Sequence, residues 1–231
     1  MKSWHYFLFL GISLWMSPIV MGKQLELVTI QGSGIAEITS LILRQAYKQI
    51  GIGLTITYLP AQRALIESNE GIVDGEVHRI LGIEKRYPNL IRIPVSIWHM
   101  KGVVFTKNVT FEVKGWQSLE PYRIGTLRGV KFVENNTQGM NRLRVRDYTQ
   151  LFLMLADNRL DIVVLAQLSG LKALKATKAE GIRILSPPLT VLKLYHYLHR
   201  KNLHLIPEIT KALKEMEQQG KIRAIWQQYL K

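Results

Sequence analysis

The sequence predicts an α/β protein whose two halves form two lobes around a cleft. Residues 25 to 71 show strand-like and helix-like patterns in the order strand, helix, strand, helix. Residues 123 to 185 show a similar alternation. Because this order is typical of a parallel sheet covered by helices, we expect two α/β units. Ligands of open α/β sheets bind beyond the carboxyl ends of the strands, which places the expected site between the units.

The first unit follows from four short patterns. Apolar and polar residues alternate in LELVTI (25 to 30), which predicts a strand. Apolar residues then recur at helical spacing over residues 35 to 50, before a glycine. LTITY (54 to 58) predicts a second strand, and residues 60 to 71 form a helix that begins with proline and ends with glycine. The next segment, DGEVHRILGIEKRYPNL (74 to 90), fits neither a clean helix nor a clean strand.

The second unit is predicted by a similar series. Residues 123 to 127 read as a strand before a glycine turn, and residues 151 to 157 as a helix. The continuous apolar run LDIVVLA (160 to 166) predicts a buried strand, and residues 181 to 185 a short one. The segment PPLTVLKLYHYLHRKN (187 to 202) then runs back across the molecule.

The C-terminal segment predicts a pair of helices. Apolar residues recur on one face from Ile209 to Leu230, and Gly220 interrupts the pattern. We expect this pair to return to the first lobe.

The N-terminus has the pattern of a secretory signal peptide. Lys2 precedes the mostly apolar run from Tyr6 to Met16, and cleavage near Gly22 would leave residues 23 to 231. An uncleaved anchor is the alternative, but the apolar run is shorter than the roughly 20 residues of a spanning helix. The chain has no cysteine, so it has neither disulfides nor thiolate metal ligands. We expect a soluble periplasmic protein.

The charge of the chain favours anionic partners. The formal net charge is +14 at pH 7, which suits a small acid in a cleft or a polyanionic surface. The basic residues are scattered without a run of five or more. This scatter, together with the export signal, argues against a nucleic-acid partner.

The order of several segments resembles the family 3 solute-binding proteins, the periplasmic receptors of polar amino-acid importers. The resemblance rests on these segments: RALIESNEGIVDG (63 to 75), IEKR (83 to 86), RIGTLRG (123 to 129), LADNRLDIVV (155 to 164) and ALKEMEQQGKIRAIWQQYL (212 to 230). It implies a two-lobed periplasmic binding protein fold of type II with two hinge crossings.

The same resemblance implies where the chain divides. After a signal peptide at residues 1 to 22, lobe one would comprise residues 23 to 104 and 193 to 231, and lobe two residues 105 to 192. The hinge strands would lie within residues 101 to 107 and 192 to 199. Two rigid lobes would then close on a ligand, with a few hinge residues absorbing the rotation.

Two arginines are candidates for holding a ligand anion. In the family, the arginine that clamps the ligand carboxylate lies twelve positions after a turn aspartate, which corresponds here to Asp74 and Arg86. Arg79 is a second candidate because it could point from the end of the preceding strand. A guanidinium pairs bidentately with a carboxylate. The alternative for each is a solvated surface arginine.

Further candidates lie in three loops and strands. The segment LRGVK matches the family loop whose amides receive the same carboxylate, which implicates Arg128, Gly129 and Val130; an ordinary tight turn is the alternative. Ser33 follows the first strand. Trp98 precedes the first crossing and could stack on a ligand, although packing is the more frequent role of tryptophan.

One departure from the family pattern bears on the ligand. Family members that bind α-amino acids have an aspartate five positions after the last aspartate of the LADNRLD-type motif, and here that position is Ala166. An ammonium group would stay unpaired in the closed cleft, which costs roughly 1 to 3 kcal/mol or more. We therefore expect a small anionic or polar metabolite.

The sequence thus predicts a monomeric, non-catalytic periplasmic solute-binding protein without metal or cofactor. It would serve an ABC permease or a sensor kinase. An enzyme on the same scaffold, resembling dehydratases of cyclic acids, is an alternative for which Glu76 is the one candidate general acid. Glu76 is also a candidate ligand-binding residue. A basic protein that docks on anionic lipid is a third possibility, with steep salt dependence.

Overall fold

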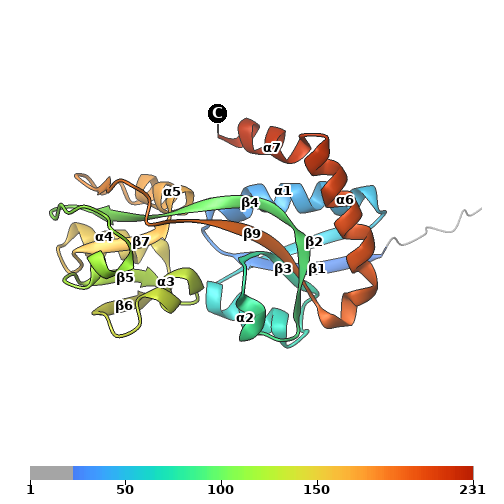
Figure 1. Ribbon diagram of the computed structural model, residues 1–231, viewed down its shortest axis with the longest axis horizontal. Coiled ribbons are helices and arrows are strands. Elements are labelled where there is room, and N and C mark those ends of the chain that lie inside the picture. Colours follow the sequence, from blue (N-terminus) through green and yellow to red (C-terminus); the bar gives the residue numbers. More distant parts are fainter. Residues whose placement is uncertain (1–22, 231) are drawn as a thin grey trace, which may run out of the picture.

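The N-terminal part of the chain forms a parallel sheet with helices packed on it (Figure 1). The computed structural model describes residues 23–230. The first elements are β1 (Gln24–Ile30), α1 (Gly34–Gln49), β2 (Gly53–Leu59), α2 (Ala61–Asn69), β3 (Gly75–Ile80) and the 3-10 turn η1 (Ile83–Lys85). β1 pairs in parallel with β2 on one side and with β3 on the other.

The local sequence explains the boundaries of α1. Ser33 caps its N-terminus, where the side-chain oxygen accepts a hydrogen bond from the amide of Ala36 at 3.3 Å. The side chains of Ile38, Ile42 and Ala46 are fully buried on one face, as the helical spacing predicts.

A second α/β unit occupies the middle of the chain. Its elements are η2 (Trp116–Leu119), β5 (Ile124–Leu127), α3 (Lys131–Asn136), β6 (Arg142–Val145), α4 (Tyr148–Ala156), β7 (Ile162–Ala166), α5 (Gln167–Thr177) and β8 (Arg183–Ile184). β5 pairs in parallel with both β6 and β7. The two α/β units lie at opposite ends of the molecule (Figure 1).

Two long antiparallel strands, β4 (Leu90–Thr106) and β9 (Thr190–His199), connect these units (Figure 1). The strand order is β2-β1-β3-β9-β4-β7-β5-β6, and β8 also pairs with β4. β4 pairs with β9 from Leu90 to Gly102 and with β7 from Gly102 to Thr106. The partner of β4 therefore changes from β9 to β7 at Gly102.

The C-terminal helices return to the first unit. The 3-10 segment η3 (Arg200–Leu205) leads into α6 (Ile206–Gln218) and α7 (Lys221–Tyr229). Gly220 lies between the two helices with φ of 69°, a conformation that favours glycine. Both helices contact α1, as expected from the sequence.

The structure confirms the predicted two-unit α/β order and the C-terminal helix pair. The sequence patterns did not predict α3, β6 or α5. The predicted signal peptide, residues 1 to 22, lies outside the described residues. Within residues 23–230, no helix has the length and apolarity needed to cross a bilayer.

Candidate functional site

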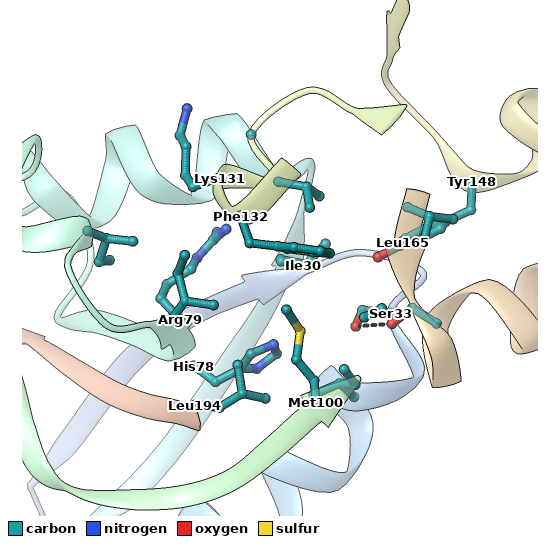
Figure 2. A pocket seen from close by; sticks show the side chains of 17 residues that line it. Ile30, Ser33, His78, Arg79, Met100, Lys131, Phe132, Tyr148, Leu165 and Leu194 are labelled. Atoms are coloured by element: carbon teal, nitrogen blue, oxygen red, sulfur yellow. Dashed lines mark hydrogen bonds between the residues drawn. The ribbon is translucent and has the colours of Figure 1, made fainter. Parts of the chain in front are cut away.

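A cavity of about 50 Å³ lies between the two units, and most of its wall is apolar (Figure 2). One unit contributes the end of β1, the start of α1 and the end of β3. The other contributes the loop after β5 and the end of β7. The apolar lining residues are Ile30, Ile35, Ile80, Ile83, Met100, Val130, Phe132, Leu165, Ala166 and Leu194. The polar side chains are Ser33, His78, Arg79, Lys131, Tyr148 and Ser169.

Arg79 forms a buried ion pair on the wall of this cavity. Its Nη2 donates to Glu76 Oε1 at 2.6 Å and to the carbonyl of Ala61 at 2.9 Å. The side chains of Arg79 and Glu76 are 5% and 0% exposed. A register shift between β3 and β9 falls between these two residues, which lets both side chains lie on the same side of the strand. Figure 2 shows the guanidinium directed toward Phe132.

The pair leaves two polar atoms without partners. Among the described residues, neither Arg79 Nε nor Glu76 Oε2 has a hydrogen-bond partner. Burial raises the pKa of Glu76 to about 7, although the charge of Arg79 opposes this shift. Arg79 can therefore donate a further hydrogen bond, in addition to those within the ion pair, at a position shielded from water.

His78 supplies a neutral imidazole to the same wall. Burial, together with the nearby charge of Arg79, lowers the pKa of His78 to about 3. Thr39 Oγ1 donates to the carbonyl of Ile35 at 2.9 Å, so it accepts from His78 Nδ1, which lies 2.9 Å away. His78 Nε2 then carries a lone pair and can accept a hydrogen bond.

The two units touch on both sides of the cavity. Lys131 Nζ donates to Gln62 Oε1 at 2.9 Å and to Glu134 Oε2 at 2.7 Å, so its charge is engaged outside the cavity. At another part of the rim, Ser33 Oγ and Ser169 Oγ are 2.9 Å apart (Figure 2). The structure is therefore a closed form in which side chains from both units meet.

Gly129 allows the closest approach of the two units. Its φ is +89°, and a Cβ atom built there would lie 2.4 Å from the backbone nitrogen of Gln62. Its amide also donates to Glu134 Oε1 at 2.8 Å. A side chain at this position would push against the start of α2.

The structure places four of the predicted site residues on the cavity wall: Ser33, Arg79, Gly129 and Val130. Glu76 does not line the cavity, because it lies buried with its carboxylate on Arg79.

Three other predicted residues do not line this cavity, and their role in ligand binding stays a prediction. Arg86 is exposed at the end of η1, where the turn directs Ile83 instead into the cavity. Arg128 is exposed, and only its backbone is held, through its amide on the carbonyl of Val145. Trp98 stacks on Trp226 with ring centroids 4.3 Å apart, outside the cavity.

The sequence reasoning missed most of the lining. His78, Phe132, Met100 and Ser169 were not among the predicted ligand-binding residues. Phe132 follows Gly129 by three positions, so the predicted loop was the available signal. Among residues 23–230, no group of three His, Asp or Glu side chains could hold a metal ion.

The buried ionisable groups predict a pH dependence of stability. Burial lowers the pKa of His78 to about 3 and that of His196 to about 4. Between pH 5 and 6 the unfolded chain therefore binds about two more protons at these histidines. Glu76, with its raised pKa, binds one more proton in the folded state over the same range. In sum, the unfolded chain binds about one proton more than the folded protein. The free energy of unfolding therefore rises by about 1 kcal/mol per pH unit.

Glu76→Gln should make this slope about twice as steep, because it removes the opposing group. Urea unfolding at pH 5 and pH 6 measures both slopes. A slope that stays the same or becomes shallower in Glu76→Gln would show that Glu76 is not protonated in the folded protein at these pH values.

Comparison with known proteins gives one relative by sequence and many by structure. No protein-family model matches the chain. An uncharacterized protein of Shewanella oneidensis is 30% identical over 193 residues, which cover 78% of this chain and 71% of the relative.

The solved structures share the architecture. A histidine kinase sensor domain with similarity to periplasmic binding proteins has a TM-score of 0.79 at 12% identity, covering 90% of this chain and 96% of that domain. An ancestral arginine-binding protein bound to glutamine has a TM-score of 0.76 at 16% identity, covering 90% and 98%. ArtJ of Geobacillus stearothermophilus, which binds arginine, lysine and histidine, has a TM-score of 0.73 at 14% identity, covering 90% and 95%. At these identities the likeness shows a shared two-lobed fold.

Proposed function

Because the chain belongs to the same family as the Shewanella oneidensis protein and has the two-lobed fold of periplasmic binding proteins, we propose that it captures a small anionic molecule between its lobes in the periplasm. One observation carries this proposal: a cavity between the two units has a buried arginine on its wall. The ligand would be held without chemical change.

The charges around the cavity favour an anion. Arg79 retains an unpartnered Nε, and no acidic side chain lines the cavity within the described part of the chain. A hydrogen bond between a guanidinium and a carboxylate is charge-assisted and roughly twice as strong as a neutral one. An anionic group is therefore the natural partner of this wall.

Capture by closure is part of the proposal. The residues that line the cavity come from both units, and β4 and β9 are the long strands that join these units. We place the hinge within residues 101 to 107 and 192 to 199, so that lobe one is 23 to 104 with 193 to 231. Rotation about these strands would open the cavity.

The alternative of an enzyme depends on Glu76, and the position of this residue does not favour it. Glu76 is fully buried and reaches the cavity only through Arg79. A general acid must come within hydrogen-bond reach of the reacting group. The geometry thus supports binding rather than acid catalysis.

Thermal melting against a panel of organic acids, sugar acids, amines and amino acids tests the proposed binding. A ligand at 100 times its dissociation constant adds about 2.7 kcal/mol, which corresponds to a rise of roughly 5 to 11 °C for a protein of this size. We expect carboxylates to give the shift. A panel in which amines or sugars alone raise the melting temperature would contradict the proposal of an anionic ligand.

The role of the captured molecule, transport or sensing, needs a test in cells. Deletion of the gene, followed by measurement of uptake of the acid that the panel identifies, separates the two. Reduced uptake supports delivery to a permease, and unchanged uptake supports a receptor that signals to a sensor kinase.

A further inference from the structure

The chemistry of the cavity wall narrows the class of ligand. We infer that this protein binds a short-chain monocarboxylate that has a mainly apolar body and no ammonium group. This inference rests on the proposed function, since it concerns the same cavity. It goes further by fixing the size of the ligand, the number of its charges and their sign.

The volume of the cavity limits the size of the ligand. A cavity of about 150 Å³ holds a benzene molecule, and the space between the closed lobes here is about 50 Å³. This space corresponds to roughly three to five water-sized groups in all, and the carboxylate itself takes three of them, so we expect an acid with about two or three carbon atoms. Its chain would contact Phe132, Met100 and Leu194, which lie on the cavity wall.

The wall provides one site for negative charge. Arg79 lines the cavity, and its buried Nε has no hydrogen-bond partner among the described residues. Lys131, the other cation in the lining, is engaged by Gln62 and Glu134. A second carboxylate would stay buried without a partner, which is strongly unfavourable. A monocarboxylate fits this wall and a dicarboxylate does not.

The wall provides no site for an ammonium group. Ala166 lines the cavity, and no Asp or Glu side chain does so within residues 23–230. The carboxylate of Glu76 is turned to Arg79. An ammonium group would lie near the charge of Arg79 without an anion of its own, and we expect this to weaken binding by about 100-fold.

A hydroxyl group, by contrast, has partners. His78 Nε2 carries a lone pair and can accept a hydrogen bond, because Nδ1 is paired with Thr39. Ser33 and Ser169 bring hydroxyl groups to the opposite side of the cavity (Figure 2). We therefore expect a hydroxy acid to bind at least as well as the unsubstituted acid.

Four matched probes test this inference by calorimetric titration of the purified protein: propionate, lactate, alanine and malonate. The first three differ only in one substituent beside the carboxylate. We expect propionate and lactate to bind, and alanine and malonate to bind about 100-fold more weakly. Equal or tighter binding of alanine or malonate would overturn the inference and leave the proposed binding function standing.

The remaining outcomes separate the inference from the proposed function. If none of the four probes binds while a larger acid of the melting panel does, the short-chain class is wrong but the binding function stands. If no compound binds in either experiment, both the inference and the proposed function are wrong.

The variant Ala166→Asp provides a second, independent test of the inference, because it adds a carboxylate to the cavity wall. In this variant we expect alanine to gain affinity relative to lactate by about tenfold or more. No relative gain, in a variant that still melts cooperatively, would show that the ligand does not lie beside residue 166. If the variant does not fold, the comparison of the four probes on the natural protein decides alone.

Discussion

Arg79→Gln should weaken binding of the most stabilising carboxylate of the melting panel by about 30-fold or more. Arg79 is 5% exposed and is held in place by Glu76 and the carbonyl of Ala61. Because its guanidinium is already oriented, little entropy is lost when an anion joins it. Isothermal titration of the variant and the natural protein measures the loss.

Two controls make this result specific. Arg86→Gln removes an equal charge from an exposed position outside the cavity, and we expect its affinity to stay within about twofold of the natural value. The double variant Arg79→Gln, Glu76→Gln avoids leaving a buried carboxylate without its partner, and we expect it to fold and to bind as weakly as the single variant. A loss in Arg86→Gln with none in Arg79→Gln would restore Arg86 as the anion-binding residue.

Gly129→Ala should prevent the lobes from closing. The added Cβ would lie 2.4 Å from Gln62 N and 2.7 Å from Gln62 Cα. These are backbone atoms of α2, which cannot move aside as a flexible side chain can. If fewer than roughly one molecule in ten reaches the closed form, the apparent affinity falls by about tenfold or more. Titration with the same carboxylate measures this fall, and small-angle scattering should show a larger radius of gyration.

Gly139→Ala is the matched control for this variant. Gly139 also has a positive φ, of +80°, but no atom lies within 4 Å of the position where its Cβ would be. Both variants suffer similar backbone strain, and only Gly129→Ala loses the contact between lobes. If the two variants bind equally well, the contact at Gly129 is not needed for binding.

The fold was predictable from the sequence because its signals are local. The alternation in residues 25 to 30 and the helical spacing in residues 35 to 50 each correspond to an element of the structure. The break at Gly220 lies between α6 and α7. By contrast, α3 spans six residues and β6 four, lengths at which a periodic pattern is too short to recognise.

The site was predictable only in part, because side-chain directions depend on tertiary structure. Arg79 and Arg86 are seven positions apart and equally basic. The register shift in β3 keeps Arg79 beside Glu76, and the left-handed Gly82 starts the turn that leaves Arg86 in solvent. No pattern of residue types in this segment distinguishes these two outcomes.

The residues that line the cavity, on which the inferred ligand class depends, were even harder to predict from the sequence. Phe132 in α3 and Met100 in β4 are 32 positions apart in the sequence, and only the tertiary structure brings both to the cavity wall. Ala166 is the exception. The comparison with the family pattern already identified it in the sequence, because amino-acid-binding members have at this position the aspartate that pairs with the ligand ammonium. The expectation of an anionic ligand thus persists as a proposal, with Arg79 in place of Arg86.

The central claim, that an anion binds Arg79 between the lobes, can be tested by observing the arginine itself. In protein labelled with ¹⁵N-arginine, the Nε–H resonance of Arg79 is assigned by its loss in the Arg79→Gln spectrum. During titration with lactate, or with the most stabilising carboxylate of the panel, this resonance should shift and saturate at the calorimetric dissociation constant, while that of Arg86 stays unchanged. Saturable binding that leaves the Arg79 resonance unmoved would contradict the account.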